Sequence, residues 1–200
     1  MTLWLRVRSV PLAIGLAVLS LLSLATPIPS AVAAPSPGGA TLALACAVSL
    51  TVPILVGWGC QRGDRLLEAV STRSIQALDL GYAVLAVGVT ALIATAMHEL
   101  GVAPAGLIAA RASLTYLGLM LFARAIGGWR LATLLPATYL VAVALIGRGE
   151  DAAHPAGWAF IAAEGEDVAS WVLTALAVLG GLLATVVAPV RRASLGRSEP

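Results

Sequence analysis

The chain has 200 residues, of which 60% are hydrophobic and only 11% are charged. Soluble domains carry about a quarter charged residues, whereas the mean hydropathy of this chain is +0.96. These values exclude a disordered chain, a nucleic-acid-binding protein and an ordinary cytosolic enzyme. The class that remains is an integral membrane protein.

Six apolar stretches are long enough to cross a bilayer, since a hydrocarbon core about 30 Å thick needs roughly 20 helical residues. They lack the period-two alternation of barrel strands. We therefore expect an all-α, polytopic helical membrane protein with a single transmembrane domain. The predicted spans lie near residues 9–26, 41–59, 77–97, 104–123, 131–147 and 169–190.

The distribution of arginine predicts the orientation of these spans, because positive charges concentrate in cytoplasmic segments. With both termini in the cytoplasm, ten of the twelve basic residues, all of them arginine, lie inside. Only Arg148 then lies outside, and Arg111 lies within the membrane. Residues 60–76 become a cytoplasmic loop, and residues 148–168, with five acidic side chains, become an outer acidic loop.

The first apolar stretch also has the features of a secretory signal peptide. Arg6 and Arg8 precede it, Pro27 and Pro29 follow it, and small residues suit cleavage after Ala33. Retention gives six spans, whereas cleavage leaves five and an outside N-terminus. The orientation of every later span is the same in both alternatives.

Arg111 is the most informative single position, because a charge near the bilayer centre costs about 2.5–3.5 kcal/mol on insertion scales. Two carboxylates on the preceding predicted span are potential partners: Glu99 near its outer end, the nearer one, and Asp79 near its inner end. The alternatives are an ion pair that locks two helices, a position at the interface, and a substrate or proton pathway. We treat Arg111, Glu99 and Asp79 as the candidate polar site.

The cytoplasmic loop contains an amphipathic segment in which leucine and valine alternate with charges. One interpretation is a solvated helix at the membrane surface; the other is an element that docks on a cytoplasmic subunit. The charged residues of this candidate docking surface are Arg62, Arg65, Glu68 and Arg73.

No catalytic or metal-binding motif is visible. His98-Glu99 lacks the second histidine of an HExxH site, since the required position is Val102. The absence of lysine excludes the phosphate-binding loop GxxxxGK[ST]. Cys46 and Cys60 lie fourteen residues apart, about 21 Å along a helix, too far for a disulfide. We expect no enzyme, no metal and no cofactor.

A series of short motifs extends from the second predicted span to the outer loop. It comprises Leu67-Glu68 with Arg73, the stretch ARASLTYLGL at 110–119, Ala123-Arg124-x-x-Gly127, Leu-Leu-Pro-x-x-Tyr at 134–139, and the aromatic stretch around Trp158. In this order they resemble small actinobacterial membrane proteins that are similar to, or encoded with, permease subunits of ATP-binding-cassette exporters. The resemblance implies a six-helix, permease-like subunit without its own nucleotide site. Where that group has an Arg-Asn pair, this chain has Arg111-Ala112.

These observations predict a multi-pass protein of the cell membrane. Its expected role is a permease-like or accessory subunit of a transporter that a separate cytoplasmic ATPase powers. The alternative is a structural or regulatory protein that assembles with other membrane proteins and transports nothing. The expected partners are the lipid bilayer, the ATPase and further copies or other subunits, and not nucleic acid.

Overall fold

The computed structural model describes residues 31–32, 42–61, 75–149 and 155–195. Apart from one pair of two-residue strands, the described elements are helical. In chain order they are β1 (Ala31–Val32), β2 (Leu42–Ala43), α3 (Leu44–Ser49), α4 (Thr51–Gln61), α6 (Ile75–Glu99), α7 (Gly106–Gly127), α8 (Trp129–Ala132), α9 (Leu134–Ile146), η1 (Gly157–Ala162) and α10 (Val168–Leu195).

Five helical segments of the described chain are long and apolar enough to cross a membrane. They are Leu44–Gln61, Ala77–Glu99, Gly106–Gly127, Trp129–Ile146 and Val168–Val187. The prediction of an all-α chain whose helices are long and apolar enough to cross a membrane is confirmed for the described residues. The predicted span at 9–26 lies outside the described residues.

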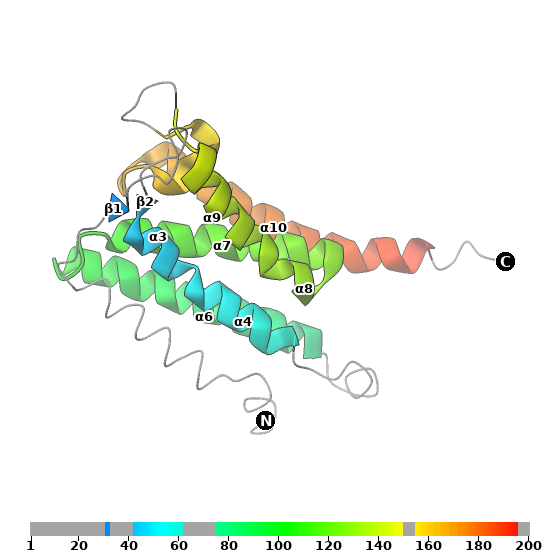
Figure 1. Ribbon diagram of the computed structural model, residues 1–200. Coiled ribbons are helices and arrows are strands. Elements are labelled where there is room, and N and C mark those ends of the chain that lie inside the picture. The colour runs from blue at the N-terminus through cyan, green and yellow to red at the C-terminus, as the bar shows by residue number, and fades with distance from the viewer. Residues whose placement is uncertain (1–30, 33–41, 62–74, 150–154, 196–200) are drawn as a thin grey trace.

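Helix α7 is the central helix of the bundle. It packs most extensively against α10 and α6, and also against α3, α8 and α9. Of its apolar stretch 72% is buried, compared with 28% for α6 and 17% for α10. Figure 1 shows α7 between these neighbours, with β1, β2 and η1 at one end of the bundle and α8 at the other.

Two spans are each broken into two helices, in both cases three residues before a proline. Proline has no N–H to donate and its ring clashes with the carbonyl four residues earlier. Pro53 therefore ends regular pairing at Ser49, and α4 begins after Leu50; Pro136 acts in the same way between α8 and α9.

The first break is repaired by a hydroxyl from the central helix. The Leu50 amide donates to the Ala47 carbonyl at 3.2 Å, the spacing of a 3₁₀ turn, instead of to the Cys46 carbonyl. Tyr116, which is fully buried, donates its hydroxyl to that Cys46 carbonyl at 3.1 Å. Buried backbone groups need such partners, so Tyr116 stabilises the break.

The contact between α7 and α10 depends on small residues. A Cβ added at Gly118 would lie 2.5 Å from the Ala177 backbone, and one added at Gly181 would clash with the Gly118 carbonyl. Small residues allow membrane helices to approach closely. Gly180, beside Gly181, faces open space, since nothing lies within 4 Å of an added Cβ.

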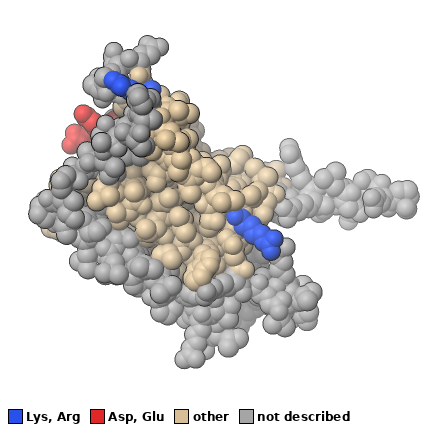
Figure 2. All heavy atoms as spheres, viewed as in Figure 1, with Lys and Arg blue, Asp and Glu red and all other residues tan. Residues whose placement is uncertain are grey.

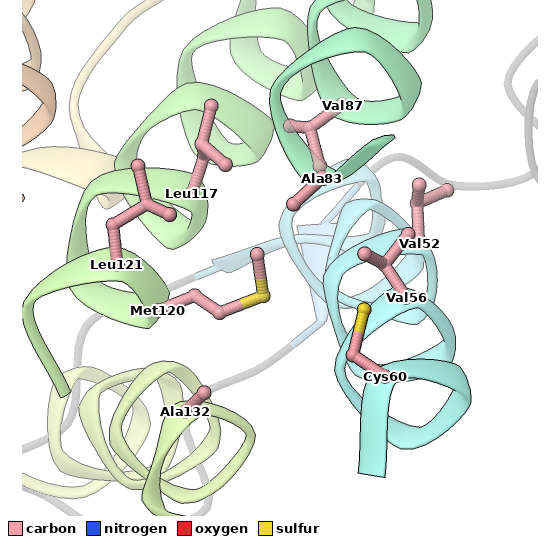
Figure 3. Close-up of a cluster of buried hydrophobic side chains, with 9 residues drawn as sticks. All are labelled: Val52, Val56, Cys60, Ala83, Val87, Leu117, Met120, Leu121 and Ala132. Atoms are coloured by element: carbon pink, nitrogen blue, oxygen red, sulfur yellow. The ribbon is translucent and has the colours of Figure 1, made fainter. Parts of the chain in front are cut away.

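The opposite half of the core joins α4, α6, α7 and α8 around a fully buried methionine. Figure 3 shows the Met120 side chain pointing toward α4 from α7. Methionine fills irregular gaps well because its side chain is unbranched and flexible. The buried cluster comprises Val52, Val56, Cys60, Ala83, Val87, Leu117, Met120, Leu121 and Ala132.

The outer surface of the bundle is apolar over most of its length. On the face seen in Figure 2, the coloured charged side chains lie toward the ends of the molecule, with an uncharged region between them. The exposed apolar surface includes large side chains such as Leu85, Leu92, Leu176 and Leu183. In a soluble protein it would promote aggregation, whereas lipid would cover it in a membrane.

Candidate functional site

Arg111 lies on α7, five residues after the helix begins, and no part of its side chain is exposed. At a rise of about 1.5 Å per residue, it lies about 8 Å inside the end of the helix. That end of the bundle also holds residues 155–167, which contain η1 and which we call the cap. Part of the predicted outer acidic loop thus folds back over the bundle.

The guanidinium of Arg111 binds the backbone of the cap. Its Nη1 donates to the Glu164 carbonyl at 2.5 Å, and its Nη2 donates to the Ala163 carbonyl. The buried Nε has no hydrogen-bond partner among the described residues. The Asp167 carboxylate and the guanidinium attract each other electrostatically. Arg111 therefore ties the central helix to the loop above it.

Side chains from three other helices also donate hydrogen bonds to cap carbonyls. Cys46 Sγ from α3 donates to Ile161 (3.3 Å), Tyr139 OH from α9 to Trp158 (2.8 Å), and Trp171 Nε1 from α10 to Gly165 (2.8 Å). With Arg111 from α7, side chains of four helices hold five carbonyls of the cap between Trp158 and Gly165. The cap is thus clamped to the bundle through its backbone.

Apolar contacts reinforce the clamp. Ala159 and Ile161 of the cap are fully buried in a cluster with Tyr116 and Val143. The Tyr139 ring lies beside two cap aromatics, with its centroid 5.9 Å from that of Phe160 and 6.5 Å from that of Trp158. Such aromatic pairs contribute about 0.5–1.5 kcal/mol beyond area burial.

A line of buried hydroxyls continues from the cap into the bundle between α7 and α10. The hydroxyls of Thr115 and Thr174 lie 3.1 Å apart, and both side chains are buried. Thr115 lies one turn after Arg111 and is 3.0 Å from its carbonyl, while Thr174 is 2.9 Å from the Ser170 carbonyl. We call Arg111, Thr115, Thr174, Ser170 and Asp167 the polar line.

Asp167 forms the N-terminal cap of α10. Its carboxylate accepts hydrogen bonds from the Ser170 hydroxyl and from the amides of Ser170 at 3.2 Å and Ala169 at 3.3 Å. The Ser170 hydroxyl, followed by these amides and the positive charge of Arg111, lowers the pKa of Asp167 below its ordinary value of 3.8. A charged carboxylate at a helix start is stabilising because it meets the unpaired amides there.

The predicted partners of Arg111 lie elsewhere. Glu99 ends α6 with an exposed side chain, and it is not among the described contacts of Arg111. Asp79 is buried near the opposite end of the bundle, where it attracts Arg124 electrostatically. The structure thus joins Arg111 to cap carbonyls and Asp79 to Arg124, and does not gather the three predicted residues into one site.

A second charged cluster therefore lies at the other end of α7. The Cζ atom of Arg124 lies 4.7 Å from the Trp129 ring centroid, a cation–π geometry. Gln61 of α4 donates to the Trp129 carbonyl at 2.9 Å, which joins α4 to α8. The charged residues of the predicted docking surface, Arg62, Arg65, Glu68 and Arg73, lie outside the described residues.

Sequence reasoning missed Asp167, Ser170, Thr115 and Thr174. Asp167 comes just before the last predicted apolar span, and Asp in that position is a helix-start signal, so its capping role was detectable. The pairing of Thr115 with Thr174 joins residues 59 positions apart, and no local pattern announces it. Among the described residues there is no group of three or more His, Cys, Asp or Glu that could hold a metal.

Comparisons with protein-family models, with curated proteins and with solved structures found no match.

Proposed function

We propose that the chain is an integral membrane subunit, permease-like or accessory, of a transporter powered by a separate ATPase. In this proposal it resides in the cell membrane with both termini in the cytoplasm and the cap outside. It assembles with the ATPase and with other copies or subunits. It carries out no enzymatic reaction of its own.

The observation that carries the proposal is the buried charge of Arg111 on the central helix, with the polar line beside it. An ionisable residue inside a membrane bundle is expensive, and by default it marks a functional site. Arg111 and the buried pair Thr115 and Thr174 belong to the part of the polar line that lies between α7 and α10. A permease needs polar groups of this kind inside an apolar bundle.

The sequence supports a separate energy source in this proposal. A phosphate-binding loop of the GxxxxGK[ST] type requires lysine, and the chain has none. An energy-driven transporter built on this chain would therefore take its ATPase from another polypeptide. The arginine-rich loop at 60–76 is the surface that we expect it to bind.

One observation favours the alternative, a structural or regulatory subunit that transports nothing. Nη1 and Nη2 of Arg111 both bind backbone carbonyls of the cap. On this view the arginine is a clamp that holds the bundle closed, and the polar line only supports it. The two proposals differ in their partners, so the partner decides between them.

The first experiment is purification of the tagged full chain in mild detergent, with mass spectrometry of the proteins that remain bound. An ATPase in a fixed ratio supports the transporter subunit. Arg65→Glu with Arg73→Glu should then abolish that association without reducing membrane insertion. Arg197→Glu, the same charge reversal near the other cytoplasmic end, serves as the matched control and should keep the ATPase.

Two results contradict this proposal. One is a wild-type chain that carries no ATPase, alone or with membrane proteins only; this favours the structural or regulatory alternative. The other is an association that survives the double reversal in the loop, whether or not the control keeps it.

A further inference from the structure

Helix α6 has an apolar face that no described residue covers. Leu85 is 66% exposed and Leu92 is 69% exposed. Gly81, Leu85, Gly88 and Leu92 follow one another at spacings of four, three and four residues, which places them on one side of the helix. Either lipid or another helix could cover such a face, and three features of the chain favour a helix.

The short strand β1 supplies the first argument. Ala31 pairs with Ala43, and Val32 pairs with Leu42, in an antiparallel arrangement that leads directly into α3. Cleavage after Ala33 would remove both residues of β1 from the mature chain. The pairing therefore favours a chain that keeps the apolar stretch 9–26, because its continuation is part of the fold.

The second argument is the short length of chain between residue 26 and β1. Position 26 lies five positions before Ala31, and an extended chain covers at most about 3.6 Å per position, or about 18 Å in total. Packed helices lie about 8–10 Å apart. A span that ends at residue 26 must therefore lie next to α3 or one helix further away.

Helix α3 contacts the cap on one flank and α6 on the other. On one flank, Cys46 packs with Ala159 and Ile161 of the cap. On the other flank, Ala45 packs with Ala91 and Ala94 of α6. The uncovered apolar face of α6 thus lies within reach of β1.

The glycines of α6 favour the close packing of another helix on this face. A Cβ added at Gly81 or Gly88 would meet nothing within 4 Å, so no described contact requires glycine there. Glycine in a helix costs about 1 kcal/mol relative to alanine. A second helix packed closely on α6 would use the space, since small residues let membrane helices approach.

We propose that residues 9–26 are retained as a sixth membrane helix and pack on the α6 face formed by Gly81, Leu85, Gly88 and Leu92. Its direction is opposite to that of α3 and α4, because the β1–β2 pairing reverses the chain. It converts the five described spans into a six-helix bundle. The proposal is independent of whether the protein transports anything.

The test uses the full chain with Cys46 and Cys60 replaced by alanine. Leu92 lies seven residues before the end of α6, which is about 10 Å from that end of the helix. In a helix that ends at residue 26, position 19 lies at the same distance from the end. Leu92→Cys is combined in turn with a cysteine at each of positions 17–20, one full helical turn. Oxidation in native membranes should link one of these pairs within a single molecule, and the intact mass should include residues 9–26.

Gly88→Leu provides a second readout, and Gly180→Leu on the lipid-facing side of α10 is its matched control. Both positions have open space in the described bundle. We expect Gly88→Leu to abolish the crosslink and to lower the unfolding midpoint by about 3–10 °C. The control should keep both the crosslink and the midpoint.

Four results overturn the proposal. The first is a mature chain that begins at Ala34. The second is a retained segment that forms no crosslink from any of the four positions. The third is a crosslink between two molecules, which would make the α6 face a contact with a second copy. The fourth is a Gly88→Leu variant with the same crosslink and unfolding midpoint as the control.

Discussion

Arg111 shows how one buried charge can organise the end of a membrane bundle. Its two terminal nitrogens donate to the consecutive carbonyls of Ala163 and Glu164. Without the arginine, these two carbonyls would lack these hydrogen bonds in apolar surroundings. Arginine suits this task better than lysine because its planar guanidinium presents several donors in a fixed fork. The charge is thereby solvated by backbone dipoles.

Replacement of Arg111 by methionine should loosen the cap. Each buried carbonyl that loses its partner costs about 1–3 kcal/mol, and Cys46, fully buried beneath the cap, should become reactive. The measurement is the rate of maleimide labelling of Cys46 in a Cys60→Ala background. Arg111→Lys keeps one donor group and should label at an intermediate rate. Equal labelling rates in all three chains would contradict the clamp.

The pKa of Asp167 predicts a pH dependence. Hydrogen bonds from Ser170 hold it below the ordinary value of 3.8, so the folded chain binds this proton less readily than the unfolded chain. The stabilisation is present above pH 3.8 and is lost as the pH falls further, through the lowered pKa of the folded state. We expect the unfolding midpoint of the wild type to fall over this range.

Two variants isolate this contribution. Asp167→Asn cannot ionise at this position. Its unfolding midpoint should therefore change less with pH in the same range. Ser170→Ala removes the largest cause of the lowered pKa, so its loss of stability should still begin near pH 3.8 but should be smaller and end at a higher pH than in the wild type. Identical pH profiles of the wild type and Asp167→Asn would show that the carboxylate does not stabilise α10.

At the scale of helices, small residues determine how closely α7 and α10 approach each other. Gly118, Ala177 and Gly181 bring the two backbones together, and this approach allows the short hydroxyls of Thr115 and Thr174 to meet. Longer side chains at the crossing would separate the hydroxyls. The polar line therefore depends on glycines that lie outside it.

Gly181→Leu should separate these helices. The added side chain would clash with the Gly118 carbonyl, and overpacking of this kind costs about 1–3 kcal/mol. Thermal unfolding in detergent should show the loss. Gly180→Leu makes the same chemical change one position away, where space is open, and should leave the midpoint unchanged. A similar loss in both variants would mean that leucine, and not the crossing, is responsible.

At the scale of the whole molecule, the cap gives the bundle two different ends. At the cap end, side chains of four helices hold the backbone of residues 155–167. At the other end, Asp79, Arg124 and Trp129 hold α6, α7 and α8. The orientation that we propose places the cap outside the cell.

Labelling of engineered cysteines in intact cells tests that orientation. In a Cys46→Ala, Cys60→Ala chain, Gly157→Cys lies on the cap, where an added Cβ meets nothing within 4 Å. Arg130→Cys lies at the other end on an exposed residue. A membrane-impermeant maleimide should label the first before lysis and the second only after lysis. The reverse pattern would place the cap in the cytoplasm.

Much of the fold was predictable because its causes are local. An apolar run of about 20 residues has few stable structures in lipid other than a helix, and the described spans match the last five predicted stretches closely. The helix breaks follow from Pro53 and Pro136, whose missing N–H groups act wherever the helix is placed. The same reasoning identified Arg111 as the costly residue.

The partners of Arg111 required the tertiary structure. Glu99 was the nearer carboxylate in the sequence, but α6 ends with that side chain exposed, and the guanidinium instead meets carbonyls more than fifty residues away. Backbone acceptors are present at every position, so a sequence pattern cannot distinguish them. Hydropathy by itself determined that this chain is built from helices long and apolar enough to cross a membrane. Only the packing of the cap on four helices decided where its central charge is held, because that packing joins distant segments through shape and not through local composition.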